Sequence, residues 1–112
     1  MESTINTLKY GNVEIAVADR GAELRSYKVD GEEFMWDRNP EFWAASSPVL
    51  FPFVGTIKNG AYSFDGNKYE ISTRHGFART EDFELVEKTE NSLKFRFFSN
   101  NETLKKYPFE FE

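Results

Sequence analysis

The sequence lacks cysteine altogether, which excludes disulfide bonds, thiolate nucleophiles and cysteine-ligated zinc. Histidine occurs once, as His75, so a metal site would depend on one imidazole and scattered carboxylates without ligand spacing. We therefore expect no metal site. Helical periodicity is also missing, because no stretch of a dozen residues carries an amphipathic helix pattern. The missing helical period favours an all-β chain.

Three further absences bear on partners and location. No apolar run approaches the ~18 residues that a membrane span needs. The first residues lack the basic and apolar regions of a secretory signal. Lys and Arg number 14 against 19 Asp and Glu, a net charge of 14 − 19 = −5 that repels phosphate backbones. The sequence predicts a cytoplasmic protein with no nucleic-acid or membrane partner.

What the chain does contain is aromatic residues, at 17%, and an apolar period of two. Val13, Ile15 and Val17 alternate with other residues, as they do in a half-buried strand. Asp30-Gly31 and Asp65-Gly66 are typical hairpin dipeptides, because both residue types tolerate positive φ. The runs expected to form strands are 13–17, 24–29, 34–36, 62–64, 69–71, 83–86 and 93–97, with one more beginning at 107–111. A single helical turn is possible over 41–47. The 112 residues suffice for one domain.

Two segments interrupt the alternation. Residues 47–55 are apolar yet carry two prolines, which predicts a buried, irregular segment of the kind that often lines a site. Residues 73–80 gather His75, Arg74 and Arg79 into one predicted loop. Histidine is the one side chain whose ordinary titration falls near neutrality, and the two arginines can orient an oxygen-rich ligand. Two interpretations of His75 stay open from the residues alone, an exposed loop histidine and a site residue.

Four aromatic side chains are further candidates for ligand contact. Trp36, Trp43, Tyr62 and Tyr69 can stack on sugar rings, although in an aromatic-rich β protein such residues usually belong to the core. A nucleophilic triad is not indicated, because Ser72 and His75 adjoin in one loop and no nucleophile elbow occurs.

The run His75-Gly76-Phe77-Ala78-Arg79 resembles the HGFAR motif of the aldose 1-epimerase (galactose mutarotase) superfamily, in its bacterial aldose 1-epimerase-related branch. Other segments resemble the family in the expected order, so that the likeness covers essentially the whole chain. These segments are Gly21-Ala22-Glu23-Leu24, Phe34-Met35-Trp36, the proline-bearing Pro48 to Gly55, the hairpin from Gly60 to Ile71, and Tyr107-Pro108-Phe109.

The resemblance implies a β-sandwich of the galactose mutarotase type, with residues 1–112 as the N-terminal part of that domain. It implies cofactor-free interconversion of the α and β anomers of a hexose or hexose phosphate, in which an acid and a base act on opposite sides of the sugar. It assigns His75 to the catalytic centre, where it holds the sugar, with Arg79, Arg74 and Thr56 as further substrate-binding positions. Many relatives carry Arg where this chain has Thr56.

Two family groups have no counterpart in the sequence, the second histidine that acts as acid and the late glutamate base. We therefore expect an aldose 1-epimerase-like isomerase that is truncated and inactive alone. A carbohydrate-binding or sensory module that has lost catalysis is the alternative, and a non-functional truncation that persists by pairing with another copy is the third. Uncovered strand edges predict either a homo-oligomer or a missing C-terminal part.

Overall fold

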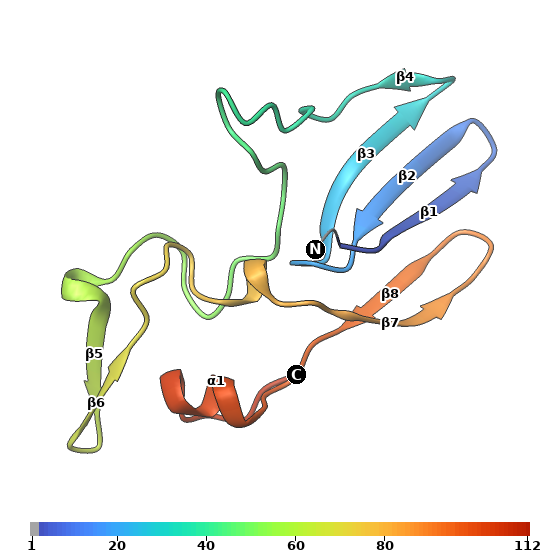
Figure 1. Cartoon of the computed structure of the whole chain (residues 1–112). Helices are drawn as coiled ribbons and strands as arrows, with labels where there is room; N and C mark the ends of the chain where they lie inside the picture. The colour runs from blue at the N-terminus through green and yellow to red at the C-terminus, as the bar shows by residue number, and fades with distance from the viewer. Residues whose placement is uncertain (1–2) are drawn as a thin grey trace.

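The computed structural model describes residues 3–112, which form three antiparallel sheets and little helix (Figure 1). The predicted all-β class is confirmed. The strands are β1 (Ile5–Tyr10), β2 (Val13–Ala18), β3 (Glu23–Val29), β4 (Glu32–Glu33), β5 (Ala61–Phe64), β6 (Asn67–Glu70), β7 (Glu84–Lys88) and β8 (Leu93–Arg96). Within residues 3–112 the one α-helix is α1 (Asn101–Lys106), and two 3-10 turns span Lys58–Gly60 and Ala78–Thr80.

The largest sheet has the strand order β1-β2-β3-β4. Its β3–β4 turn is the predicted one, with Asp30 and Gly31 at φ values of 53° and 82°. β4 is only two residues long, so the strand expected over 34–36 is wrong. The carboxylate of Glu33 explains where the ladder ends, because it accepts a hydrogen bond from the Tyr27 N–H at 2.8 Å. The Phe34 N–H still donates to the Tyr27 carbonyl, at 2.9 Å.

One face of this sheet is apolar and open. The cross-strand register aligns Leu8 with Ile15 and Ile15 with Tyr27, and therefore places all three on the same face. Tyr10, Val13 and Val29 join them, and 54% of Tyr10 and 40% of Tyr27 are exposed. We call these six residues the open sheet face. The opposite face carries polar residues such as Lys9, Glu14 and Lys28.

The β5–β6 hairpin confirms the second predicted turn, at Asp65-Gly66. The β7–β8 hairpin lies beside β1, and Lys88 Nζ donates to the Thr7 carbonyl at 2.8 Å (Figure 1). The strand expected over 107–111 is wrong. Residues 101–106 form α1 instead, capped by Asn100, and the chain returns so that the Ser99 N–H donates to the Phe111 carbonyl at 3.0 Å.

The long connection from β4 to β5 is irregular. No helical turn forms over 41–47. A single turn lies earlier, over residues 39–43, where the N–H groups of Phe42 and Trp43 both donate to the Asn39 carbonyl. Residues 47–55 are irregular as predicted, but they are only partly buried, and 74% of Val54 is exposed. This segment is nevertheless anchored, because the Phe51 carbonyl accepts from the Phe77 and Ala78 N–H groups at 3.0 and 3.1 Å.

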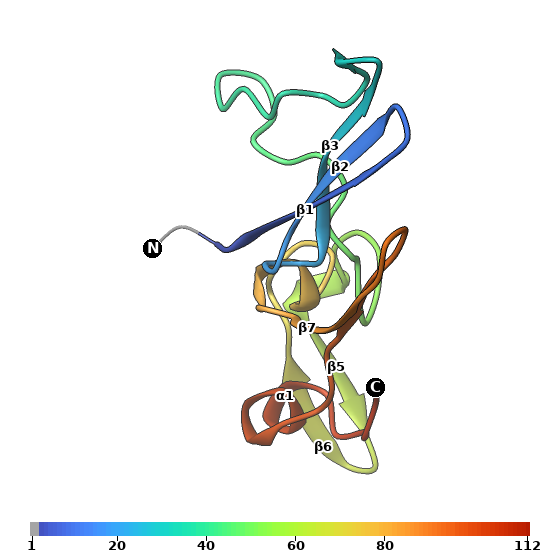
Figure 2. The same cartoon turned by 90° about the vertical axis from the view of Figure 1, so that its right-hand side faces the viewer.

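The buried core is small. The buried hydrophobic residues are Val17, Ala18, Ile71, Phe77 and Ala78. Around Phe77 a partly buried aromatic cluster forms from Phe51, Phe97, Tyr107 and Phe111. The radius of gyration is 16.4 Å, against about 13 Å for a compact domain of this length. Figure 2 shows the reason, because the β1–β4 sheet lies at one end and β5, β6 and α1 at the other.

Over residues 3–112 the structure contains no helix that is both long and apolar enough to span a bilayer.

Candidate functional site

His75 is fixed by a reciprocal pair of hydrogen bonds with Gly55. The His75 N–H donates to the Gly55 carbonyl, and the Gly55 N–H donates to the His75 Nδ1, each at 2.7 Å. An imidazole nitrogen that accepts a hydrogen bond carries no proton, so the neutral ring holds its proton on Nε2. The ring therefore offers Nε2–H as a donor to a ligand. We call this pair of bonds the Gly55–His75 clamp.

Gly76 follows His75 because no other residue fits there. Its φ is +77°, and a Cβ at this position would lie 2.3 Å from the Phe51 carbonyl oxygen. The close approach lets the next two N–H groups, of Phe77 and Ala78, reach that carbonyl. Phe77 is thereby buried in the aromatic cluster. His75 thus projects from a backbone that the core holds in place.

Arg79 ends the same segment and is half-buried. Its Nε donates to the Arg74 carbonyl at 2.8 Å, so the guanidinium is oriented by the loop that carries His75. Gly21 packs against the Arg79 backbone, where an added Cβ would lie 2.9 Å from the Arg79 carbonyl oxygen. The 73–80 loop is therefore braced on one side by Phe51 and on the other by the turn that precedes β3.

A cleft of about 180 Å³ brings these residues together with a distant part of the chain. His75 and Arg79 form one wall. The other wall comes from the β4–β5 connection and consists of Trp43, Ala45, Ser46, Ser47, Pro48 and Leu50. None of these described lining residues is acidic, so a histidine and an arginine set the electrostatic character of the cleft. Such a lining suits a ligand rich in oxygen atoms.

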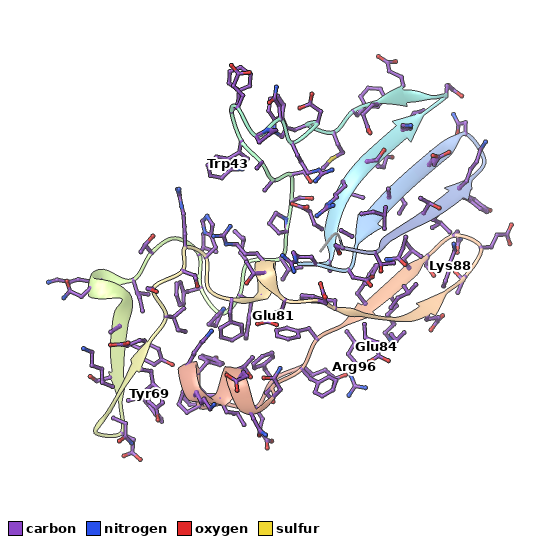
Figure 3. The ribbon with its side chains drawn as sticks, in the orientation of Figure 1. Trp43, Tyr69, Glu81, Glu84, Lys88 and Arg96 are labelled. Atoms are coloured by element: carbon purple, nitrogen blue, oxygen red, sulfur yellow. The ribbon has the colours of Figure 1, made fainter. Side chains whose placement is uncertain are left out.

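Trp43 lines the cleft, and 55% of it is exposed. Figure 3 shows it on the long loop after β4, away from the β7–β8 hairpin that carries Glu84, Lys88 and Arg96. The Arg74 guanidinium lies 5.8 Å from the centre of the Trp43 ring, within cation–π range. The Trp43 carbonyl accepts from the Trp36 Nε1–H at 2.7 Å. Trp43 is therefore an oriented aromatic surface beside His75.

The positions predicted from the sequence thus fall in three places. His75 and Arg79 line the cleft, and Arg74 lies at its edge against Trp43. Thr56 is exposed and is not among the cleft-lining residues, although it adjoins Gly55 of the clamp. Ser46 and Ser47 were missed, since isolated serines in a loop give no signal. Of the four aromatic residues considered as sugar-stacking groups, Trp43 is the one that lines the cleft, whereas Tyr62 and Tyr69 stack on each other.

Two groups away from the cleft, Glu33 and Tyr62, have shifted pKa values. Hydrogen bonds from the Ser26 hydroxyl and the Tyr27 N–H lower the pKa of Glu33, an exposed residue of the β3–β4 hairpin. Burial raises the pKa of Tyr62, whose hydroxyl donates to the Lys106 carbonyl. Among the described residues no three acidic or histidine side chains are grouped to hold a metal ion. The cleft is distinguished by the geometry of the residues that line it.

Comparison with known proteins identifies the family. The family model described as aldose 1-epimerase matches residues 4–112. The chain belongs to the aldose 1-epimerase family. Two proteins of Lactococcus lactis subsp. lactis, the plasmid and chromosomal forms of LacX, are each 38% identical to it over 97 residues. Each match covers 82% of this chain but 32% of the LacX protein, so this chain spans about a third of the length of these relatives.

Solved structures of the same family have this fold. A galactose mutarotase related enzyme from Lactobacillus acidophilus superimposes with a TM-score of 0.90 at 42% identity, over 96% of this chain and 36% of that one. A galactose mutarotase-like protein from Lactobacillus casei gives a TM-score of 0.89 at 35% identity, over 96% and 37%. A putative aldose 1-epimerase from Escherichia coli, 19% identical, shares the fold with a TM-score of 0.72 over 89% and 38%. The galactose mutarotase type of all-β fold is thereby established.

Proposed function

We propose that residues 1–112 form the N-terminal part of a mutarotase-like β-sandwich domain and supply the sugar-holding part of a site that interconverts hexose anomers. The observation that carries the proposal is the cleft in which His75, Arg79 and Trp43 meet. The Nε2–H of His75 donates to a sugar oxygen, the guanidinium of Arg79 binds hydroxyl oxygens, and the Trp43 ring stacks on an apolar sugar face. Stacking on Trp43 requires the Arg74 guanidinium, which lies 5.8 Å from the centre of the Trp43 ring, to move aside.

The reaction needs two proton transfers. In this proposal the cleft residues hold the sugar but do not supply both the acid and the base. An acid protonates the ring oxygen while a base removes the proton of the anomeric hydroxyl, and the bond between C1 and the ring oxygen breaks. The open-chain aldehyde rotates about its C1–C2 bond and closes on the other face. No cofactor or metal enters. His75, the only histidine of the chain, is the catalytic-centre residue that keeps the sugar in place.

Sugar binding tests the proposal. Titration of the 112-residue chain with D-galactose or D-glucose, followed by tryptophan fluorescence and ¹⁵N NMR, should shift the signals of Trp43 and residues 75–79. Replacement of Arg79 by Gln should weaken binding roughly tenfold, because a charge-assisted hydrogen bond is lost. Arg96→Gln is the matched control, because Arg96 lies on β8 away from Trp43 and should leave the affinity unchanged (Figure 3). Equal weakening by both variants, or no binding by the parent chain, would refute this assignment.

Binding without turnover is the second candidate function. It is favoured by one observation, that none of the described cleft-lining residues carries a carboxylate to act as base. Polarimetry of freshly dissolved α-D-galactose separates the two. We expect the 112-residue chain to leave the rate at its buffer value, since each missing group typically contributes roughly 10²–10⁴-fold. A heat-sensitive acceleration would show that the chain holds its own acid and base. That the substrate is a hexose phosphate rather than a hexose stays a prediction. So does the cytoplasmic location.

A further inference from the structure

Glu23 is a buried carboxylate for which the proposed reaction has no use. It is the first residue of β3, and only 5% of it is exposed. A carboxylate out of water is costly unless charge and hydrogen bonds compensate it. The compensation is visible, because Arg25 Nε lies 2.7 Å from Oε1 and the Ser46 N–H donates to Oε2 at 3.0 Å. Each oxygen of Glu23 therefore has a different, fixed partner.

Ser46 belongs to the cleft wall and comes from a segment without regular structure. Such a segment keeps its position only through the bonds that its backbone and side chains make elsewhere. For residues 46–49 these bonds converge on 21–24. The Ser46 and Ser47 hydroxyls both donate to the Leu24 carbonyl, at 2.7 and 2.9 Å, and the Val49 N–H donates to the Gly21 carbonyl at 2.8 Å. The bond from the Ser46 N–H to Glu23 is the charge-assisted member of this set.

The same short stretch also touches the opposite wall. Gly21 packs on the Arg79 backbone, and its N–H donates to the Glu81 carbonyl at 2.8 Å. Residues 21–24 thus lie between the Ser46–Pro48 wall and the His75–Arg79 wall and set their separation.

We propose that Glu23 is a positioning residue, which holds the Ser46–Pro48 wall at the correct distance from His75 and Arg79 for a sugar to bind. The inference rests on the proposed sugar-binding function of the cleft. Glu23 acts through the Ser46 N–H and does not itself line the cleft.

The chain contains a matched control in Glu33. That carboxylate also accepts backbone N–H bonds, from Tyr27, Phe34 and Met35, but it belongs to the β3–β4 hairpin and does not line the cleft. Glu33→Gln therefore makes the same chemical change as Glu23→Gln in another place. A control amide is also available, since the Ile71 N–H donates to the Gly60 carbonyl at 2.9 Å and has no bond to residues 21–24.

The experiment compares the 112-residue chain with Glu23→Ala, Glu23→Gln and Glu33→Gln by ¹⁵N NMR, amide hydrogen exchange and titration with D-galactose. We expect Glu23→Ala to speed exchange of the Ser46 amide at least roughly tenfold, without the same change at Ile71, and to weaken galactose binding. Glu23→Gln keeps an acceptor oxygen and should restore part of both, with the Ser46 proton shifted upfield because a neutral acceptor is weaker. Glu33→Gln should match the parent chain in both measurements.

Two outcomes overturn the proposal: an unchanged Ser46 amide in a folded Glu23 variant, or a released Ser46 amide with unchanged galactose affinity. If Glu23→Ala does not fold, Glu23→Gln decides alone by the same criteria. If the parent chain binds no galactose, the sugar-binding function fails, and Ser46 exchange still decides whether Glu23 holds the wall.

Discussion

At the scale of single residues, Gly76 shows how a backbone position can be as restrictive as a reacting side chain. The residues on both sides of it are hydrogen-bonded, His75 to Gly55 and Phe77 to the carbonyl of Phe51. Any side chain at Gly76 would have to occupy the space of the Phe51 carbonyl. The chemistry of His75 therefore depends on the absence of a side chain in the next residue.

We predict that Gly76→Ala lowers the free energy of unfolding by about 3 kcal/mol, combining a disfavoured positive φ with a steric clash. Gly66→Ala is the matched control, because Gly66 has nearly the same φ, +79°, but nothing lies within 4 Å of its added Cβ. That variant should lose only about 1 kcal/mol. Urea unfolding followed by circular dichroism measures both. Similar losses would show that the Phe51 contact adds no cost.

At the scale of elements, the hairpins and the helix differ in how plainly they are encoded. Asp30-Gly31 and Asp65-Gly66 each determine a turn locally, so both hairpins could be predicted. Helix α1 was missed because six residues show no apolar period. Its one signal is the pair Asn100 and Thr103, in which the Asn100 side chain accepts from the Thr103 N–H and the Thr103 hydroxyl accepts from the Asn100 N–H.

We predict that Asn100→Ala opens α1 by removing this cap, at a cost of about 1 kcal/mol. Amide exchange of residues 103–107 should quicken roughly fivefold. The neighbouring Asn101→Ala serves as control, because Asn101 is exposed and alanine is the better helix former there. Protection of α1 that is equal in the two variants would mean that tertiary packing alone holds the helix.

The β3–β4 hairpin should respond to acid through Glu33. Hydrogen bonds from the Ser26 hydroxyl and the Tyr27 N–H lower its pKa, so the folded hairpin prefers the ionised carboxylate. This contribution is present above the ordinary Glu pKa and disappears as the pH falls through the lowered folded-state value. NMR titration should show the Tyr27 and Phe34 amides shifting at a pH below the ordinary Glu range, and no such shift in Glu33→Gln. A Glu33 midpoint at the ordinary value would contradict the assignment.

The site could be predicted only in part, because only some of its residues are neighbours in the sequence. His75 and Arg79 are four residues apart, so a local motif could place them together. Trp43 and Ser46 lie some thirty residues earlier. Ser46 reaches the cleft through its hydrogen bonds to Glu23 and Leu24 of β3, and no local pattern reveals this contact between distant segments. Strand β1 was also missed, because Asn6 and Thr7 between Ile5 and Leu8 break the strict alternation.

At the scale of the whole molecule, the open sheet face is the dominant feature. Tyr10, Tyr27 and their neighbours leave apolar area in contact with water, and both edges of the β5–β6 and β7–β8 hairpins are unpaired within the described sheets. Apolar faces and free edges of this kind favour association. We propose that the 112-residue chain pairs with a second copy, most simply as a symmetric dimer.

We predict that sedimentation equilibrium at micromolar concentration finds a dimer of the 13.0 kDa chain. Tyr10→Lys should shift it towards monomer, because a charge on the open sheet face must be desolvated on association. Thr7→Lys places the same charge on the opposite face and should leave the dimer intact. A monodisperse monomer that unfolds cooperatively would rule out this association.

The Gly55–His75 clamp also orders events in time. It closes a loop of 20 residues, and the β5–β6 hairpin lies entirely inside that loop. Hairpins form within roughly 1–10 μs, and once the Ile71 N–H has reached the Gly60 carbonyl, only short stretches on either side remain to be closed. We therefore expect the β5–β6 hairpin to form first, from Asp65-Gly66, and the imidazole to reach its final position afterwards. We expect a change in that turn to slow assembly of the cleft, although it touches no residue that lines it.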